Sequence, residues 1–240
     1  MSDKKTVFIT GSNRGIGRAT VEVFASKGWN IIAHARQENE DFSIFLKELS
    51  EKYNVEIRSV FFDICDEELV KTQIKNNISK EKIKIHALVN NAGVMDISLF
   101  MMTNMENIKE VFDVNLFSHM KVTQLLLKRM STGSSIVNVA SMDGFEPHKG
   151  ESAYAASKAA LIAWTQVLAQ EFAGRIRVNA VAPCAVNTDM AHSIADKANW
   201  SEDQLLDPKD VANVIYHLCS DDAVGITGDV LKLSGKQIYN

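Results

Sequence analysis

The stretch TVFITGSNRGIG, which runs from Thr6 to Gly17, joins a short β-branched run to three closely spaced glycines. Its apolar first half predicts a buried strand. Glycines at positions 11, 15 and 17 let the chain bend tightly and approach a pyrophosphate, which would rest on the amides and the positive dipole end of the next helix. The stretch therefore predicts a strand–turn–helix unit that binds a dinucleotide.

The same alternation of strand and helix continues along the chain. Short β-branched runs, several of them apolar on both faces, are separated by helix-period segments, which predicts a parallel sheet covered by helices on either side. We expect a single Rossmann-type, doubly wound α/β domain over residues 1–240, with about seven strands. The expected strands are Thr6–Thr10, Asn30–Ala35, Glu56–Phe62, Ala87–Asn90, Ser135–Ala140, Arg177–Ala182 and Val230–Leu233. Residues 187–207, the least strand-like region after the sixth strand, are expected to form a substrate lid.

Composition narrows the class of function. The 240 residues are 46% hydrophobic, enough for a sizeable core, and carry a net charge of −4. Without a basic field, nucleic acid is not an expected partner. The N-terminal apolar run is too short for a signal peptide or a membrane span, so we expect a cytoplasmic protein that does not bind a membrane.

Cysteine and histidine spacing give no sign of a metal. Cys65, Cys184 and Cys219 form an odd set without ligand-like spacing, which suits free thiols in a reducing compartment. The six histidines show no paired spacing either. We therefore expect no metal site.

The end of the second expected strand bears on the choice of cofactor. An NAD site usually carries an acidic residue there for the ribose 2′-hydroxyl, whereas a 2′-phosphate needs a cation. The chain reads His34-Ala35-Arg36, and Arg14 in the glycine turn can reach the same place. These arginines favour NADP(H) over NAD(H), with a solvated strand end as the alternative role for Arg36.

Tyr154 and Lys158 stand four residues apart, so on a helix they share a face. A cation beside a phenol favours the phenolate and lowers the phenol's pKa, which turns tyrosine into a usable acid–base group. Ser141, thirteen residues upstream of Tyr154, could supply a hydroxyl partner. The spacing alone is weak evidence and gains weight only beside the cofactor turn.

Together these motifs resemble the classical short-chain dehydrogenase/reductase family over nearly the whole chain. The resemblance rests on Thr10–Gly17, the Asn90-Asn91-Ala92-Gly93 run, Ser141, and the Tyr154-x-x-x-Lys158 pair, in the family's order and spacing. It implies that Tyr154 is the acid–base, that Lys158 lowers its pKa and binds the nicotinamide ribose, and that Ser141 donates to the substrate oxygen. Asn115 resembles the family's fourth catalytic residue, which anchors a water.

The resemblance also implies a set of cofactor contacts along the chain. Asp63 and Ile64 resemble the pair beside adenine, and residues 183–188 resemble the loop that holds the carboxamide. The expected cofactor-binding residues are Gly11, Ser12, Asn13, Arg14, Gly15, Ile16, Gly17, Arg36, Asp63, Ile64, Asn91, Ala92, Gly93, Tyr154, Lys158, Pro183, Val186 and Thr188.

Two departures from the family pattern concern the substrate. Cys184 stands where the family usually has glycine, so its thiol could narrow the pocket. The alternative is that Cys184 is a small packed side chain without effect on the substrate. The chain looks most like 3-oxoacyl-acyl-carrier-protein reductases, yet Gln170 stands where these often have arginine, and only Lys128 and Arg129 remain nearby. His148 and Lys149 could face the pocket mouth or lie in a solvated loop.

The expected function is NADP(H)-dependent interconversion of a small ketone or aldehyde and an alcohol. A 3-oxoacyl-carrier-protein or acyl-CoA reductase is one alternative, and a non-catalytic nucleotide-binding regulatory protein is another. The family implies a homotetramer or homodimer. An apolar stripe including Val122, Leu125, Leu126 and Met130, together with Ala159, Ile162 and residues 164–168, permits such assembly, and packing within the monomer would explain it equally.

Overall fold

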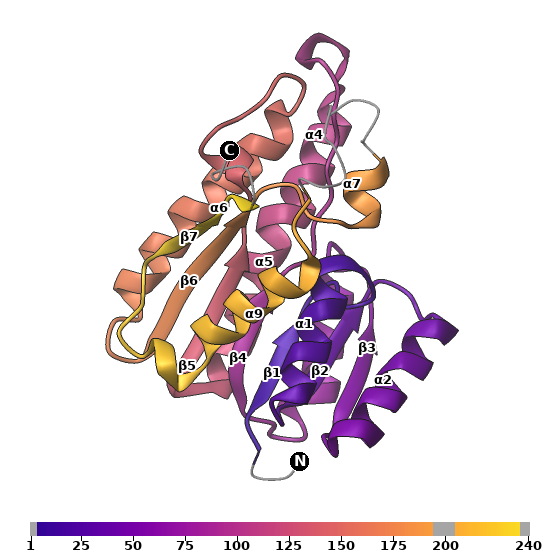
Figure 1. Cartoon of the computed structure of the whole chain (residues 1–240), viewed down its shortest axis with the longest axis vertical. Coiled ribbons are helices and arrows are strands. Elements are labelled where there is room, and N and C mark those ends of the chain that lie inside the picture. The colour runs from indigo at the N-terminus through magenta and orange to yellow at the C-terminus, as the bar shows by residue number, and fades with distance from the viewer. Residues whose placement is uncertain (1–3, 194–204, 236–240) are drawn as a thin grey trace.

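The computed structural model describes residues 4–193 and 205–235 and contains a seven-stranded sheet (Figure 1). All neighbouring strands are parallel, in the order β3-β2-β1-β4-β5-β6-β7. The strands are β1 (Thr6–Ile9), β2 (Asn30–Ala35), β3 (Ile57–Phe61), β4 (Ile85–Asn90), β5 (Met130–Val139), β6 (Ile176–Pro183) and β7 (Val230–Leu233). The expected doubly wound fold is confirmed, with β5 beginning five residues earlier than the sequence indicated.

Helices cover both faces of this sheet (Figure 1). On one face lie α1 (Gly15–Ser26), α2 (Glu40–Tyr53) and α9 (Pro208–Cys219), and on the other α3 (Glu67–Ile74), α5 (Ser118–Leu126) and α6 (Ser152–Glu171). Successive residues of a strand point to opposite faces of the sheet. In β1, Val7 and Ile9 pack against the helices of the first face, and Phe8 packs against those of the second. Because both faces are buried, β1 and β2 are apolar nearly throughout.

The helix after β4 changes its winding midway. It runs as α4 (Met105–Phe112), a π-helical segment η3 (Asp113–Phe117) and α5, with right-handed helical backbone at both junctions. Such wider turns often mark functional positions in helices. The sequence predicts this helix and places Asn115 on it, but nothing in its spacing indicated the π-helical turn.

The expected lid is only partly covered by the structure. Residues 194–204 lie outside the described part of the chain, and the flanking segment Asp189–Ser193 forms the short helix α7. The two ends of the expected lid lie side by side, because Asn187 N–H donates to Leu206 C=O at 2.9 Å and Leu206 N–H donates to Ala185 C=O at 2.9 Å. This pairing fixes the base of the segment beside the carboxyl end of β6.

Within the described ranges, the structure has no helix of the length and apolarity needed to cross a membrane.

Candidate active site

A cleft of about 720 Å³ opens at the carboxyl ends of the strands. It spans the point between β1 and β4 where the strand order reverses, which is where doubly wound sheets bind ligands. Most of the residues predicted from the sequence line it: Gly11, Asn13, Arg14, Gly15, Ile16, Arg36, Asp63, Ile64, Asn91, Ala92, Gly93, Ser141, Tyr154, Lys158, Pro183, Val186 and Thr188. Ser12, Gly17 and Asn115 are not among its lining residues and support it from behind.

The glycine turn has the geometry of an anion cradle. Gly11 and Gly15 adopt the left-handed region, with φ of 63° and 52°. A Cβ on Gly17 would lie 2.0 Å from the Gly11 carbonyl oxygen, so no other residue fits there. The first turn of α1 holds no acidic residue, and no side chain caps it. Its free amides and dipole therefore face the cleft ready for a phosphate.

Hydrogen bonds tie this turn to the segment after β4. The Thr10 hydroxyl accepts from the N–H groups of Asn91 at 2.8 Å and Ala92 at 3.0 Å. The Asn91 side-chain amide donates to the carbonyls of Thr10 and Gly11, both at 3.0 Å. Ser12 is fully buried and donates its hydroxyl to Ile9 C=O at 2.8 Å, so its side chain holds the turn together.

His34 also supports the turn, and the sequence analysis missed this role. Its Nδ1 accepts from Gly11 N–H at 3.3 Å and its Nε2 donates to Phe62 C=O at 2.9 Å. Burial lowers the pKa of His34 to about 4, so the ring is neutral near pH 7 and can accept at Nδ1. The signal available in the sequence was a polar side chain on a buried strand, two residues before Arg36.

Arg36, predicted to meet a 2′-phosphate, lies at the cofactor end of the cleft. Its guanidinium pairs with Asp63 Oδ2 at 2.9 Å and is mostly exposed. Arg14 lines the same cleft as the N-cap residue of α1. The arginine at the strand end is therefore paired with the neighbouring carboxylate, while most of its side chain stays in contact with solvent.

Ser141, Tyr154 and Lys158 come together on the other side of the cleft. Tyr154 and Lys158 share one face of α6, with Lys158 Nζ 5.7 Å from the centre of the tyrosine ring. Both side chains are buried. Lys158 Nζ donates to Val139 C=O at 2.8 Å.

Burial controls the protonation of both groups. It lowers the pKa of Lys158 to about 8, against an opposing contribution from Asp143. It also raises the pKa of Tyr154, helped by the charges of Asp143 and Glu151 and opposed by a hydrogen bond with Ser141. This rise is the opposite of the lowered pKa that was expected beside Lys158, because burial is the largest effect on the phenol. The phenol is therefore protonated near pH 7 and can donate its proton to a carbonyl oxygen.

Asn115 lies behind this group, in the π-helical segment. Its side chain donates to Val94 C=O at 2.9 Å and to the Ser157 hydroxyl at 3.0 Å, and it accepts from Val94 N–H at 2.9 Å. It is fully buried. Asn115 therefore joins the helix to the chain after Gly93 and to α6, which carries Tyr154 and Lys158.

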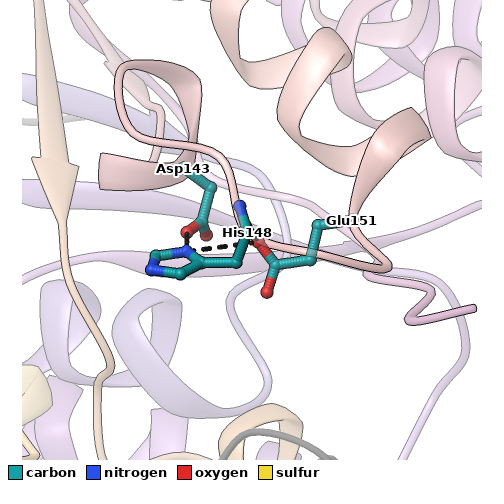
Figure 2. A group of neighbouring side chains, drawn as sticks. All are labelled: Asp143, His148 and Glu151. Atoms are coloured by element: carbon teal, nitrogen blue, oxygen red, sulfur yellow. Dashed lines mark hydrogen bonds and ion pairs between the residues drawn. The ribbon is translucent and has the colours of Figure 1, made fainter.

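Asp143 and Glu151 are two carboxylates that the sequence analysis did not place in the site. Asp143 Oδ2 accepts from the Ser141 hydroxyl at 2.8 Å, and its Oδ1 lies 3.2 Å from His148 Nδ1. Figure 2 shows His148 between the two acids, with Glu151 Oε2 3.6 Å from the same nitrogen. Burial, and next the charge of Asp143, raise the pKa of Glu151.

Asp143, His148 and Glu151 each offer one atom that could bind a metal ion, and these three atoms lie within 4.8 Å of one another. The spacing of cysteines and histidines in the sequence had not indicated a metal site. The place of Glu151 three residues before Tyr154 does not by itself show that its side chain faces the cleft.

Cys184 lines the cleft beside Pro183. Burial raises the pKa of its thiol, so the thiol form is favoured over the reactive thiolate. A Cβ on Gly15 would lie 3.0 Å from the Thr188 methyl group, which places the expected carboxamide loop directly against the glycine turn. The two ends of the cofactor site are thus packed on each other.

Comparisons with known proteins give matches over most of the chain. A family model described as short chain dehydrogenase matches residues 5–199. The 3-oxoacyl-[acyl-carrier-protein] reductase of Aquifex aeolicus is 36% identical over 240 residues, covering 96% of each chain. A short chain dehydrogenase from Burkholderia cenocepacia, solved in complex with NADP, superposes with a TM-score of 0.87 at 27% identity, covering 96% of each chain. The actinorhodin polyketide ketoreductase, solved with NADPH, gives 0.87 at 25% identity, covering 100% of this chain and 99% of that one.

Proposed function

The chain belongs to the short-chain dehydrogenase family, an oxidoreductase family acting on CH–OH and carbonyl groups with NAD(P), and on this premise we propose that it is an NADP(H)-dependent carbonyl reductase. The observation that carries the proposal is the meeting of Ser141, Tyr154 and Lys158 across the cleft from a glycine turn shaped for a pyrophosphate. The substrate would be a ketone or aldehyde, or the matching alcohol in the reverse direction.

The residues of the cleft fit a nicotinamide dinucleotide. Its pyrophosphate would rest on the amides at the start of α1, from Gly15 to Gly17, because the N–H groups of Gly11 and Ser12 already donate to His34. Its adenine end would lie near Asp63 and Ile64. Lys158 would bind the nicotinamide ribose, with Thr188 and its neighbours at the carboxamide. The bound cofactor supplies a hydride, which no side chain of the protein can provide.

The chain's own residues would handle the proton. Tyr154 is proposed to donate its proton to the substrate oxygen during reduction and to take it back during oxidation. Ser141 would donate a hydrogen bond to the same oxygen as negative charge develops there. Lys158, fixed by Val139 C=O, would stabilise the phenolate that Tyr154 leaves behind. Asn115 would keep the helix that carries Tyr154 and Lys158 in register.

The test is reduction of a panel of ketones and aldehydes, followed by the absorbance of NADPH. Tyr154→Phe should lower kcat by at least about a hundredfold, because it removes the proton donor and little volume. Tyr53→Phe, at the end of α2 away from the cleft, is the matched control and should leave kcat unchanged. Full activity in Tyr154→Phe would refute the proposed role of this residue.

The preference for NADP(H) has its own test. Arg36→Asp should lower kcat/KM with NADPH by about tenfold or more relative to NADH, since a cation–phosphate contact is lost and a repulsive charge is added. Lys47→Asp makes the same charge change on the exposed face of α2 and should leave the ratio of the two cofactors as it is. Equal use of both cofactors by the unmodified chain would contradict the preference.

Reduction of a 3-oxoacyl thioester is the second candidate, supported by the name of the Aquifex relative. Lys128 is exposed and could bind an acidic carrier protein. Arg129 already donates a hydrogen bond from Nε to Ile83 C=O at 3.0 Å, so fewer of its N–H groups remain for a carrier. Acetoacetyl thioesters of CoA and of an acyl carrier protein distinguish the candidates. A strong preference for the carrier thioester, reduced by Lys128→Glu, would favour the second one.

We also propose a homodimer or homotetramer in the cytoplasm. Most of the expected stripe, including Val122, Leu126, Ile162 and Leu168, is buried inside the monomer. The support for assembly comes from Phe117 and from Val167, an exposed member of the stripe; they are 53% and 50% exposed on η3 and α6, two segments that pack together.

A further inference from the structure

Two carboxylates, Asp143 and Glu151, line the substrate side of the cleft, which Lys149 and Lys158 also line. Asp143 accepts the hydrogen bond of the Ser141 hydroxyl, and Glu151 lies one short loop away with its side chain only 7% exposed. The charges of both acids raise the pKa of Tyr154. The cofactor end of the cleft is instead lined by two cationic side chains, Arg14 and Arg36.

The hydrogen bond to Asp143 has a consequence for Ser141. While Ser141 donates to Asp143, its single proton is not available to a substrate carbonyl. A carboxylate so close to a developing oxyanion also disfavours the negative charge. A substrate that brings its own positive charge to Asp143 would remove both obstacles, because it would release the Ser141 hydroxyl and neutralise the acid.

His148 indicates how such a cation would be held. Its Nδ1 lies 3.2 Å from Asp143 and 3.6 Å from Glu151, bridging the two acids, while its side chain is 71% exposed (Figure 2). An exposed side chain on a loop can turn away at little cost, whereas Glu151 is buried and stays. An ammonium group has three donors and could bridge the same two carboxylates.

We propose that Asp143 and Glu151 form a cation subsite that selects carbonyl substrates bearing an ammonium group close to the carbonyl, or the corresponding amino alcohols. This inference rests on the proposed function. In the reduction, the carbonyl carbon gains the hydride from the reduced cofactor, which is oxidised, and the oxygen gains the Tyr154 proton. The ammonium is unchanged. The apolar residues of this part of the cleft, Val94, Met95, Ile97 and Met142, favour a short aliphatic body.

Aminoacetone and hydroxyacetone are matched probes that differ in the ammonium. The unmodified chain should reduce aminoacetone with a kcat/KM about tenfold or more above that for hydroxyacetone, as expected for a hydrogen-bonded charge pair. Asp143→Asn should remove most of this preference, chiefly through KM for aminoacetone, and Glu151→Gln should weaken it. Glu48→Gln makes the same change on an exposed side chain of α2 that does not line the cleft, so it should keep the preference.

A second measurement covers the case in which aminoacetone is not turned over. Propylammonium should inhibit reduction of the best carbonyl substrate competitively, at least about tenfold better than propanol, and Asp143→Asn should abolish the difference. Reduction of carbonyls without any preference for positive charge, or with a preference that survives Asp143→Asn, would overturn this inference and leave the proposed function standing. Absence of all carbonyl reduction would overturn both.

A metal would give a different result. If Zn²⁺ or Mn²⁺ raised the activity, a chelator lowered it, and both effects vanished in Asp143→Asn, the three side chains would be metal ligands and the ammonium subsite would be refuted.

Discussion

Lys158 is proposed to serve the reaction, yet its buried charge opposes folding. Its pKa is lowered by burial to about 8 from 10.5. Between these pH values the unfolded chain binds more protons than the folded one, so this lysine makes stability rise with pH across that window. Below pH 8 its unfavourable contribution, roughly 3 kcal/mol from the size of the shift, is fully present.

Lys158→Met should therefore raise the Tm of the cofactor-free protein near neutral pH by several degrees while abolishing activity. The gain should shrink as the pH rises from about 8 towards 10.5 and should disappear above about 10.5, where the lysine becomes neutral in both states. Thermal unfolding monitored by circular dichroism across this range measures it, with the exposed Lys128→Met as control. A Tm that falls in Lys158→Met at neutral pH would mean that the bond to Val139 C=O outweighs the cost of burial.

The residues that line or support the cleft differ in how well their positions could be predicted from the sequence. Ser141, Tyr154 and Lys158 could be predicted because their side chains and spacing carry the chemistry directly. Asp143 and Glu151 could not, because the turn through Met142–Gly144 and the start of α6 decide that both acids face the cleft. His34 was hidden for another reason, since a polar residue in a buried strand gives no sign of its hydrogen-bond partner until the Gly11 turn is placed above it.

At the scale of the element, the turn between β1 and α1 depends on backbone space. A Cβ on Gly17 would meet the Gly11 carbonyl oxygen at 2.0 Å and the Asn91 side chain at 2.6 Å, while the φ of Gly17 is not in the left-handed region. The cost of any side chain here is therefore steric, and the backbone of the turn must move. The same backbone is proposed to hold the pyrophosphate.

Gly17→Ala should weaken NADPH binding by at least about tenfold and lower the Tm. Quenching of protein fluorescence by NADPH gives the affinity. Gly225→Ala is a matched control, because a Cβ there meets nothing within 4 Å and its φ is not positive, so it should be neutral or slightly stabilising. Equal affinities for the two variants would show that the turn can widen without losing the cofactor.

The elements themselves were predicted unevenly. A strand buried on both faces is visible in the sequence as an apolar run, and β2 has the expected bounds. β7 also has the expected bounds, although it is only partly buried. The π-helical segment around Asn115 could not be predicted, because helical periodicity does not distinguish one wider turn. The side chain of Asn115 in this segment makes tertiary hydrogen bonds to Val94 and Ser157, which helical periodicity does not show either.

At the scale of the whole molecule, the repeated strand–helix pattern predicts a doubly wound parallel sheet, and the structure adds the strand order that places the cleft at the switch between β1 and β4. Assembly does not follow so easily. An apolar helix stripe looks the same in sequence whether it packs on its own sheet or on a second copy, and here Val122 and Leu126 pack on the sheet side. Only the exposed fraction of each side chain separates the two cases.

If η3 and α6 form the interface between copies, Phe117 and Val167 would be covered in the assembly. Light scattering on the eluting protein should then give two or four times the 26.6 kDa of one chain. Phe117→Glu combined with Val167→Glu should shift the mass towards the monomer, because two charges would be buried without partners. Val224→Glu changes an apolar side chain that is 79% exposed after α9 and should leave the mass as it is. A mass of one chain for the unmodified protein would contradict the assembly and leave the cleft, which is built from a single chain, unaffected.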